Sequence, residues 1–178
     1  MSTILSYKIH TVTPYINWIY FFHAWGFQPR YAAIANIHGC DACRAMWLAS
    51  FPVEERNKAS EAMQLFKEAN RMLDVLDRDY EVRTIFKLCK ANSDGDNLVI
   101  EKAENQFMVF PLLRQQTPKK DGSPFLCLSD FIRPLSSGIP DTLGAFASSI
   151  DADMEGLYEQ DPYKHLLVQT LSDRLAEA

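Results

Sequence analysis

The stretch Val82-Arg-Thr-Ile-Phe-Lys-Leu88 decides the fold of this chain, because the spacing of apolar residues changes there. Before it, apolar residues recur at helical intervals, and within it they alternate with the period of two that is typical of a β-strand. Turn-forming residues follow at Asn92-Ser-Asp-Gly-Asp-Asn97, and apolar residues resume at Leu98-Val-Ile100. An alternating run, a glycine-containing turn and a second apolar run together predict a β-hairpin.

Outward from the hairpin, the chain divides into helices and short strands. Proline and glycine separate three further apolar runs that predict strands at 106–110, 125–128 and 142–148. Helices are predicted from Thr13-Pro14 to Gly26, at about 41–50, after Pro52, and from Asp161 onward. We therefore predict an α+β fold with a mostly antiparallel sheet flanked by helices, in one domain over residues 1–178.

Two of the predicted helices have a single apolar face. In the first, Trp18, Phe21, Phe22 and Trp25 fall at positions i, i+3, i+4 and i+7. In the helix after Pro52, one stripe carries Ala62, Leu65, Phe66, Ala69, Met72, Leu73 and Leu76, and charged residues fill the other side. Such faces are expected to pack on a hydrophobic core.

Composition excludes several classes of function. The chain has 178 residues, of which 47% are hydrophobic, which is enough for a core. Its formal charge of −5 argues against nucleic acid and anionic membranes as partners. With no signal-peptide pattern and no long apolar run, a cytoplasmic location is expected.

The helix that begins at Asp161 continues to Ala178 without a stop signal. A helix end usually shows glycine or asparagine, and this one shows neither. We expect this helix to be part of a longer element.

Two cysteines form the spaced pair Cys40-Asp-Ala-Cys43, with His38 nearby. This pattern is typical of half a zinc site or of a redox pair. A structural zinc needs four ligands and the sequence has no second CxxC, so packed thiols at a helix start are the favoured interpretation and no metal is predicted. His38, Cys40 and Cys43 remain weak candidates.

Seven blocks of sequence carry a resemblance to one family, in that family's order. They are Tyr15–Gly26, Leu65–Asp74, Ala91–Asp96, Leu113–Gln116, Leu126–Pro134, Gly144–Ala147 and Leu171-Ser-Asp-Arg-Leu-Ala-Glu-Ala178. The chain resembles the activation domain of cobalamin-dependent methionine synthase. The resemblance implies reductive reactivation, in which the domain presents S-adenosylmethionine as methyl donor to a cobalamin whose cobalt has been oxidised to Co(II). It also implies a cobalamin-binding module and a flavodoxin-type electron donor as partners.

The resemblance also suggests roles for individual residues. Asn17 stands where the family has an S-adenosylmethionine-binding aspartate, and Asp173 and Glu177 match carboxylates implicated in docking to the cobalamin module. A polar residue on the wet side of a helix remains the alternative for Asn17, and a solvated helix face for the two acids. The family's Arg-Pro-x-x-Gly-Tyr-Pro motif does not occur in this sequence.

These features are consistent with three functions. The first is the reactivation domain of a 5-methyltetrahydrofolate–homocysteine methyltransferase, without activity on its own. The second is a docking module that binds a cobalamin protein but no ligand. The third is a small zinc or redox protein that uses Cys40 and Cys43.

Overall fold

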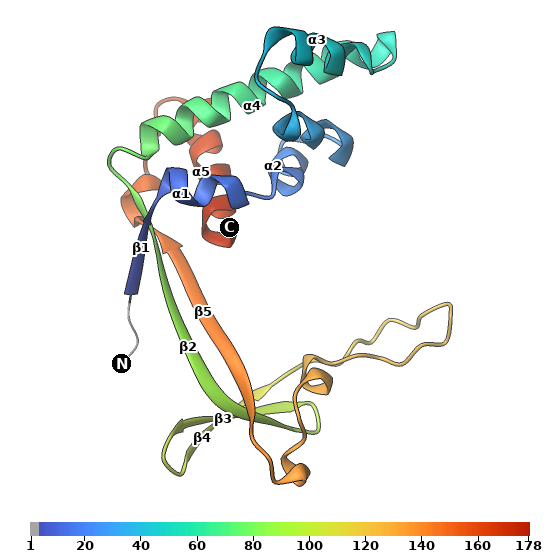
Figure 1. Cartoon of the computed structure of the whole chain (residues 1–178), viewed down its shortest axis with the longest axis vertical. Helices are drawn as coiled ribbons and strands as arrows, with labels where there is room; N and C mark the ends of the chain where they lie inside the picture. The colour runs from blue at the N-terminus through green and yellow to red at the C-terminus, as the bar shows by residue number, and fades with distance from the viewer. Residues whose placement is uncertain (1–3) are drawn as a thin grey trace. The chain divides into compact units, whose positions relative to one another are not determined.

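The computed structural model describes residues 4–178 and has the predicted α+β class (Figure 1). The α-helices are α1 (Ile9–Val12), α2 (Trp18–Ala24), α3 (Asp41–Ala49), α4 (Arg56–Leu76) and α5 (Pro162–Glu177). The strands are β1 (Ile4–Lys8), β2 (Glu81–Asp94), β3 (Asn97–Ala103), β4 (Gln106–Pro111) and β5 (Asp141–Ile150). Several 3-10 helices connect these elements.

The sheet has five strands in the order β1-β2-β3-β4, and β5 also pairs with β2. Strands β2 and β3 form the predicted hairpin, in which Asp94 lies opposite Asn97. The turn between them contains Gly95 at a φ of +57°, a conformation that glycine adopts without steric cost. Strand β4 returns antiparallel to β3. The hairpin prediction is thus confirmed.

The described residues form two compact units. Unit 1 comprises residues 85–147, and unit 2 comprises residues 4–84 and 148–178. Strands β2 and β5 run from one unit into the other. The prediction of a single domain stays a prediction, and residues 1–3 lie outside the described part of the chain.

The hydrophobic core lies in unit 2 and is built around α4. Helices α1, α3 and α5 contact α4, and Trp18 of α2 packs edge-on against Phe66 at 4.7 Å. The predicted stripe of α4 is buried except at Phe66, which is half-buried. Phe21 and Phe22 are fully buried, so the aromatic face predicted for the first helix is confirmed.

The predicted start of that helix was wrong. A 3-10 turn covers Thr13–Tyr15, and the backbone then becomes extended at Ile16 and Asn17. Helix α2 begins only at Trp18, because the side chain of Asn17 accepts the Ile19 N–H and caps a new helix there.

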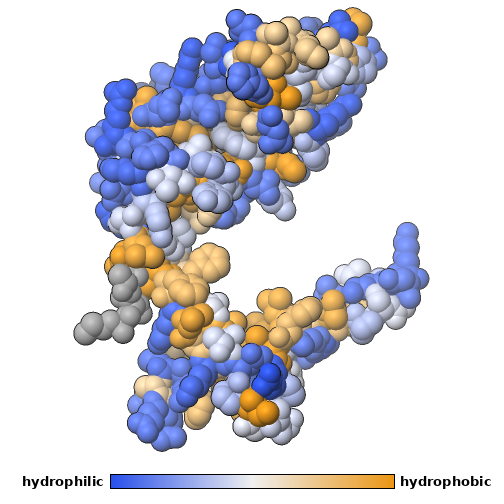
Figure 2. Space-filling model, in the orientation of Figure 1, coloured by the Kyte–Doolittle hydropathy of each residue, from blue (hydrophilic) through white to orange (hydrophobic). Residues whose placement is uncertain are grey.

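Unit 1 buries few apolar side chains. Among its described residues, only Ala91, Leu98 and Cys127 belong to the buried hydrophobic set. Phe107, Val109 and Phe146 are more than half exposed, and apolar side chains are visible on the surface of this unit in Figure 2. An exposed apolar surface of this kind is typical of a site where a protein partner, a membrane or a ligand binds.

The strand predicted at 125–128 does not form. A 3-10 helix, η4, covers Leu128–Phe131 instead. The Asp130 carboxylate accepts the Cys127 N–H at 2.9 Å, which closes a local turn in place of a strand ladder.

Candidate functional site

Asn17 stands at the start of α2, beside a surface hollow of about 520 Å³. Its side-chain oxygen accepts the Ile19 N–H at 3.1 Å. An amide oxygen has two lone pairs and its nitrogen has two donors, so most of the hydrogen-bonding capacity of Asn17 remains for a ligand. Trp18, Ala32 and Asn36 also line the hollow.

Asp173 and Glu177 are both exposed on the last turns of α5, but their charges are not equivalent. Arg174 pairs with Glu177 through two contacts, of 2.8 and 3.2 Å. Within residues 4–178, no cation lies within ion-pair distance of Asp173. Asp173 is therefore the carboxylate that can accept a new cationic partner at the lower cost.

Helices α2 and α5 bring these predicted residues to the same end of a helix pair. Trp25, just after α2, packs against Tyr163 at the start of α5, with ring centroids 5.4 Å apart. Tyr20, near the start of α2, lies 5.8 Å from the guanidinium of Arg174, near the end of α5. The two helices thus run in opposite directions, and Asn17 lies towards the end of the pair that carries Asp173.

The predicted weak metal candidates also lie together. The donor atoms of His38, Cys40 and Cys43 are all within 4.8 Å of one another. Hydrogen bonds from the Cys43 thiol and from His38 lower the pKa of Cys40 to about 7, while the bond to Cys40 raises the pKa of Cys43. All four cysteines of the chain are free thiols.

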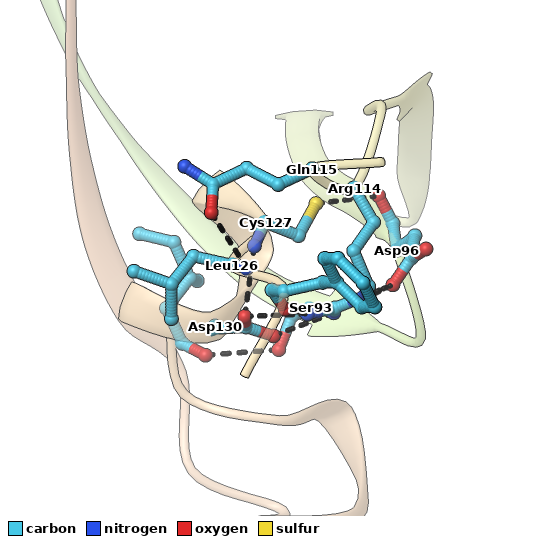
Figure 3. Close-up of polar contacts among 9 residues, drawn as sticks. Ser93, Asp96, Arg114, Gln115, Leu126, Cys127 and Asp130 are labelled. Carbon is cyan, nitrogen blue, oxygen red and sulfur yellow. Dashed lines mark hydrogen bonds and ion pairs between the residues drawn. The ribbon is translucent and has the colours of Figure 1, made fainter. Parts of the chain in front are cut away.

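A polar cluster around Arg114 in unit 1 was not predicted (Figure 3). The guanidinium donates to Asp96 through Nε and Nη2, at 3.0 and 2.7 Å, and to Asp130 through Nη1 and Nη2, both at 2.7 Å. Nη1 also donates to the Phe125 carbonyl at 2.7 Å. All five N–H donors of Arg114 are therefore used.

This cluster joins three of the blocks that carry the family resemblance. Asp96 belongs to the hairpin turn, Arg114 to the segment after β4, and Asp130 to η4. Hydrogen bonds from Arg114 lower the pKa of Asp130 to about 2. The only signal in the sequence was the presence of a charged residue in each block, which does not reveal that these charges pair.

None of the helices among residues 4–178 has the length and apolar character that crossing a membrane requires.

Residues 8–178 match the family model described as the vitamin B12-dependent methionine synthase activation domain. The chain belongs to this family. Among solved structures, it is similar to a crystal structure of the MetH reactivation domain bound to AdoHcy, with 32% sequence identity and a TM-score of 0.72. That similarity covers 99% of this chain and 52% of the other, so this activation-domain sequence spans about half the length of the solved chain.

Proposed function

We propose that this chain takes part in the reductive reactivation of a vitamin B12-dependent methionine synthase, with S-adenosylmethionine as methyl donor. The similarity over 99% of the chain to a reactivation domain bound to AdoHcy is the observation that carries the proposal. AdoHcy is the product of methyl transfer from S-adenosylmethionine, so a site that binds one recognises most of the other. A flavodoxin-type protein would supply the electron.

Asn17 and its hollow fit part of such a ligand. A hollow of about 520 Å³ lies in the range of small-molecule sites. The free lone pair of the Asn17 oxygen can accept from an ammonium or face a sulfonium. An amide does so more weakly than a carboxylate, because only the carboxylate adds the attraction of opposite charges to the charge-assisted hydrogen bond.

The end of α5 supplies the proposed docking contact with the cobalamin module. A histidine that leaves cobalt regains a basic nitrogen and can become cationic. Asp173 is exposed and lacks an ion-pair partner within residues 4–178, so it can accept that cation without breaking an existing pair. Glu177 would first have to leave Arg174.

The exposed apolar strands of unit 1 support the binding of further polypeptide. Phe107 and Phe146 are 63% and 76% exposed. The similarity covers 52% of the solved reactivation-domain chain. We infer that further polypeptide packs on these strands when the protein works.

Two titrations of the purified chain test the function. The first follows docking to a cobalamin-binding module in the Co(II) state, and the second follows heat release on addition of S-adenosylmethionine. We expect docking, together with a dissociation constant for the ligand no tighter than about 1 mM, or about −4 kcal/mol.

The outcomes separate the alternatives. A micromolar dissociation constant would show that these residues hold the complete ligand site, contrary to the proposal. Docking without detectable binding of S-adenosylmethionine, even at high ligand concentration, would indicate that the chain is only a docking module. The absence of docking, with or without the ligand, would refute the proposed role.

A further inference from the structure

A cluster of three side chains in unit 2 has no part in the function proposed above. His38, Cys40 and Cys43 bring one imidazole and two thiols within 4.8 Å of one another. Among the described residues, no other group of three or more histidine, cysteine or acidic side chains is arranged to hold a metal ion.

The start of α3 holds the two sulfurs together. Cys40 has an extended backbone, with φ −76° and ψ 152°, and immediately precedes the first helical residue. Its sulfur accepts the Cys43 N–H at 3.3 Å, and the first helical turn places Cys43 Sγ 2.8 Å from Cys40 Sγ. The backbone therefore preforms a chelating pair, and its formation needs little further ordering of the chain.

The donor set selects the class of metal ion. Hard cations such as Mg²⁺ and Ca²⁺ prefer oxygen ligands, whereas thiolates and imidazole suit Zn²⁺. Zinc with two cysteines, one histidine and an exchangeable fourth ligand is an established coordination. Two Zn–S bonds of about 2.3 Å at a tetrahedral angle hold the sulfurs about 3.8 Å apart, so the pair must open by about 1 Å.

The surroundings leave room for that fourth ligand. A hollow of about 360 Å³ beside the cluster is lined by His38, Cys43, Met46 and Trp47, among others. His38 is exposed, and Cys40 and Cys43 are half-buried. An ion can therefore enter from solvent without opening the core.

A disulfide is the competing chemistry for the same two sulfurs. A disulfide uses only the thiols and gives the imidazole no role, whereas a metal site uses all three donors. We propose that His38, Cys40 and Cys43 bind one Zn²⁺ ion through two sulfurs and one ring nitrogen, with water as the fourth ligand. Binding releases to solvent whatever protons the two thiols still carry at the working pH, and it transfers no electrons.

The test is a competition titration of the reduced 178-residue chain with Zn²⁺ against a chromophoric chelator. We expect one ion per chain. The double variant Cys40→Ser/Cys43→Ser should bind at least about a hundredfold more weakly, and His38→Ala about ten- to a hundredfold more weakly. The control is Cys89→Ser, which removes a half-buried thiol outside the cluster and should leave zinc affinity unchanged.

Two further measurements make the result independent of affinity alone. Co²⁺ in place of zinc should give the intense visible absorption bands of a tetrahedral site and a thiolate charge-transfer band. It should also quench the fluorescence of Trp47, which lies one helical turn beyond Cys43. All variants, and the protein treated with a chelator, should keep a cooperative thermal melt, because the core does not include these three residues.

Several results would overturn the zinc site. One is equal zinc affinity of the double variant and the parent. Another is an octahedral Co²⁺ spectrum without a thiolate band. A third is an unchanged affinity and spectrum in His38→Ala, which would leave only a dithiol. Unfolding of the metal-free protein would also contradict the assignment, because the proposed ion is accessory to the fold.

Discussion

Replacing Asn17 by aspartate restores a carboxylate at the start of α2 and should strengthen binding of S-adenosylmethionine. The backbone conformation at this position already suits a cap, since Asn17 is extended and accepts the Ile19 N–H at 3.1 Å. Aspartate and asparagine cap helices about equally well, so the substitution should not disturb the local fold. Asn17→Asp therefore changes the charge beside the hollow and little else.

The size of the effect is that of an exposed ion pair. The ligand ammonium is charged in both variants, so Asn17 already accepts a charge-assisted bond and Asn17→Asp adds only the attraction of opposite charges. Because the side chain is exposed, solvent screens that attraction to about 0.2–1 kcal/mol. We expect the dissociation constant to fall about 1.4- to fivefold. The added charge should also stabilise α2 by about 0.3–1 kcal/mol through the helix dipole.

Trp18 provides the assay. Its side chain lines the same hollow and is held edge-on by Phe21 and Phe66, at 5.2 and 4.7 Å between ring centroids. The indole N–H resonance of Trp18 can be followed while S-adenosylmethionine is added to millimolar concentration. Asn36→Asp is the control, because it places a carboxylate in the same hollow at a residue that does not belong to α2.

Two results would refute the reasoning. If Asn17→Asp stabilises the protein but leaves ligand affinity unchanged, Asn17 is a helix cap and no ligand contact. If Asn36→Asp improves affinity equally, the effect is only the general attraction of a cation to added negative charge. Asn17→Ala separates the two roles further, since loss of the cap should lower the free energy of unfolding by about 1 kcal/mol.

Three more predictions concern docking, acid stability and the core. Asp173→Asn should weaken docking to the Co(II) cobalamin module more than Glu177→Gln does, because Glu177 is already paired with Arg174 within α5. The difference between the two variants should vanish as the pH rises above the pKa of the partner histidine, and equal affinities at pH 6 would contradict the prediction. The pKa of Asp130 is lowered from 3.8 to about 2, so the stability that this carboxylate contributes is complete above about pH 4 and is lost as the pH falls towards 2. When the free energy of unfolding is followed through an acid titration, Asp130→Asn should lack this step, and an unchanged titration would argue against the ion pair. Leu171 of α5 is fully buried, so Leu171→Ala should lower the free energy of unfolding by about 2–5 kcal/mol in a denaturant melt. Leu166 is 49% exposed, so Leu166→Ala should lower it much less, and similar losses would place α5 outside the core.

Elements whose signals lie within a few residues of one another were predictable. The hairpin of β2 and β3 follows from alternation around a glycine turn, and the structure contains it, with Asp94 opposite Asn97. The apolar stripe of α4 and the N-cap of α5 at Asp161 are equally local, and both are present in the structure. The family resemblance rests on ordered blocks along the chain and needs no knowledge of how they fold.

Elements that depend on partners far along the chain were not predictable. Residues 125–128 have the composition of a strand, yet Arg114 donates to the Phe125 carbonyl at 2.7 Å and the Gln115 N–H donates to the Leu126 carbonyl at 2.9 Å. Strand β1 was not anticipated either, because its place at the end of the sheet depends on pairing with β2. In both cases a hydrogen-bond partner from another segment decides between two conformations that the local sequence permits.

The sequence by itself therefore determined the class of fold, the apolar faces of the helices and the family, because periodicity and ordered motifs are properties of the chain alone. Only the tertiary structure brought Asn17 to the end of a helix pair that carries Asp173, since that proximity depends on α2 and α5 running in opposite directions. It also distinguished two acids that look alike in sequence: Arg174 pairs with Glu177, whereas no cation among residues 4–178 lies within ion-pair distance of Asp173. Charge pairing acts over a few ångströms in space, and distances in space are set by the path of the whole chain.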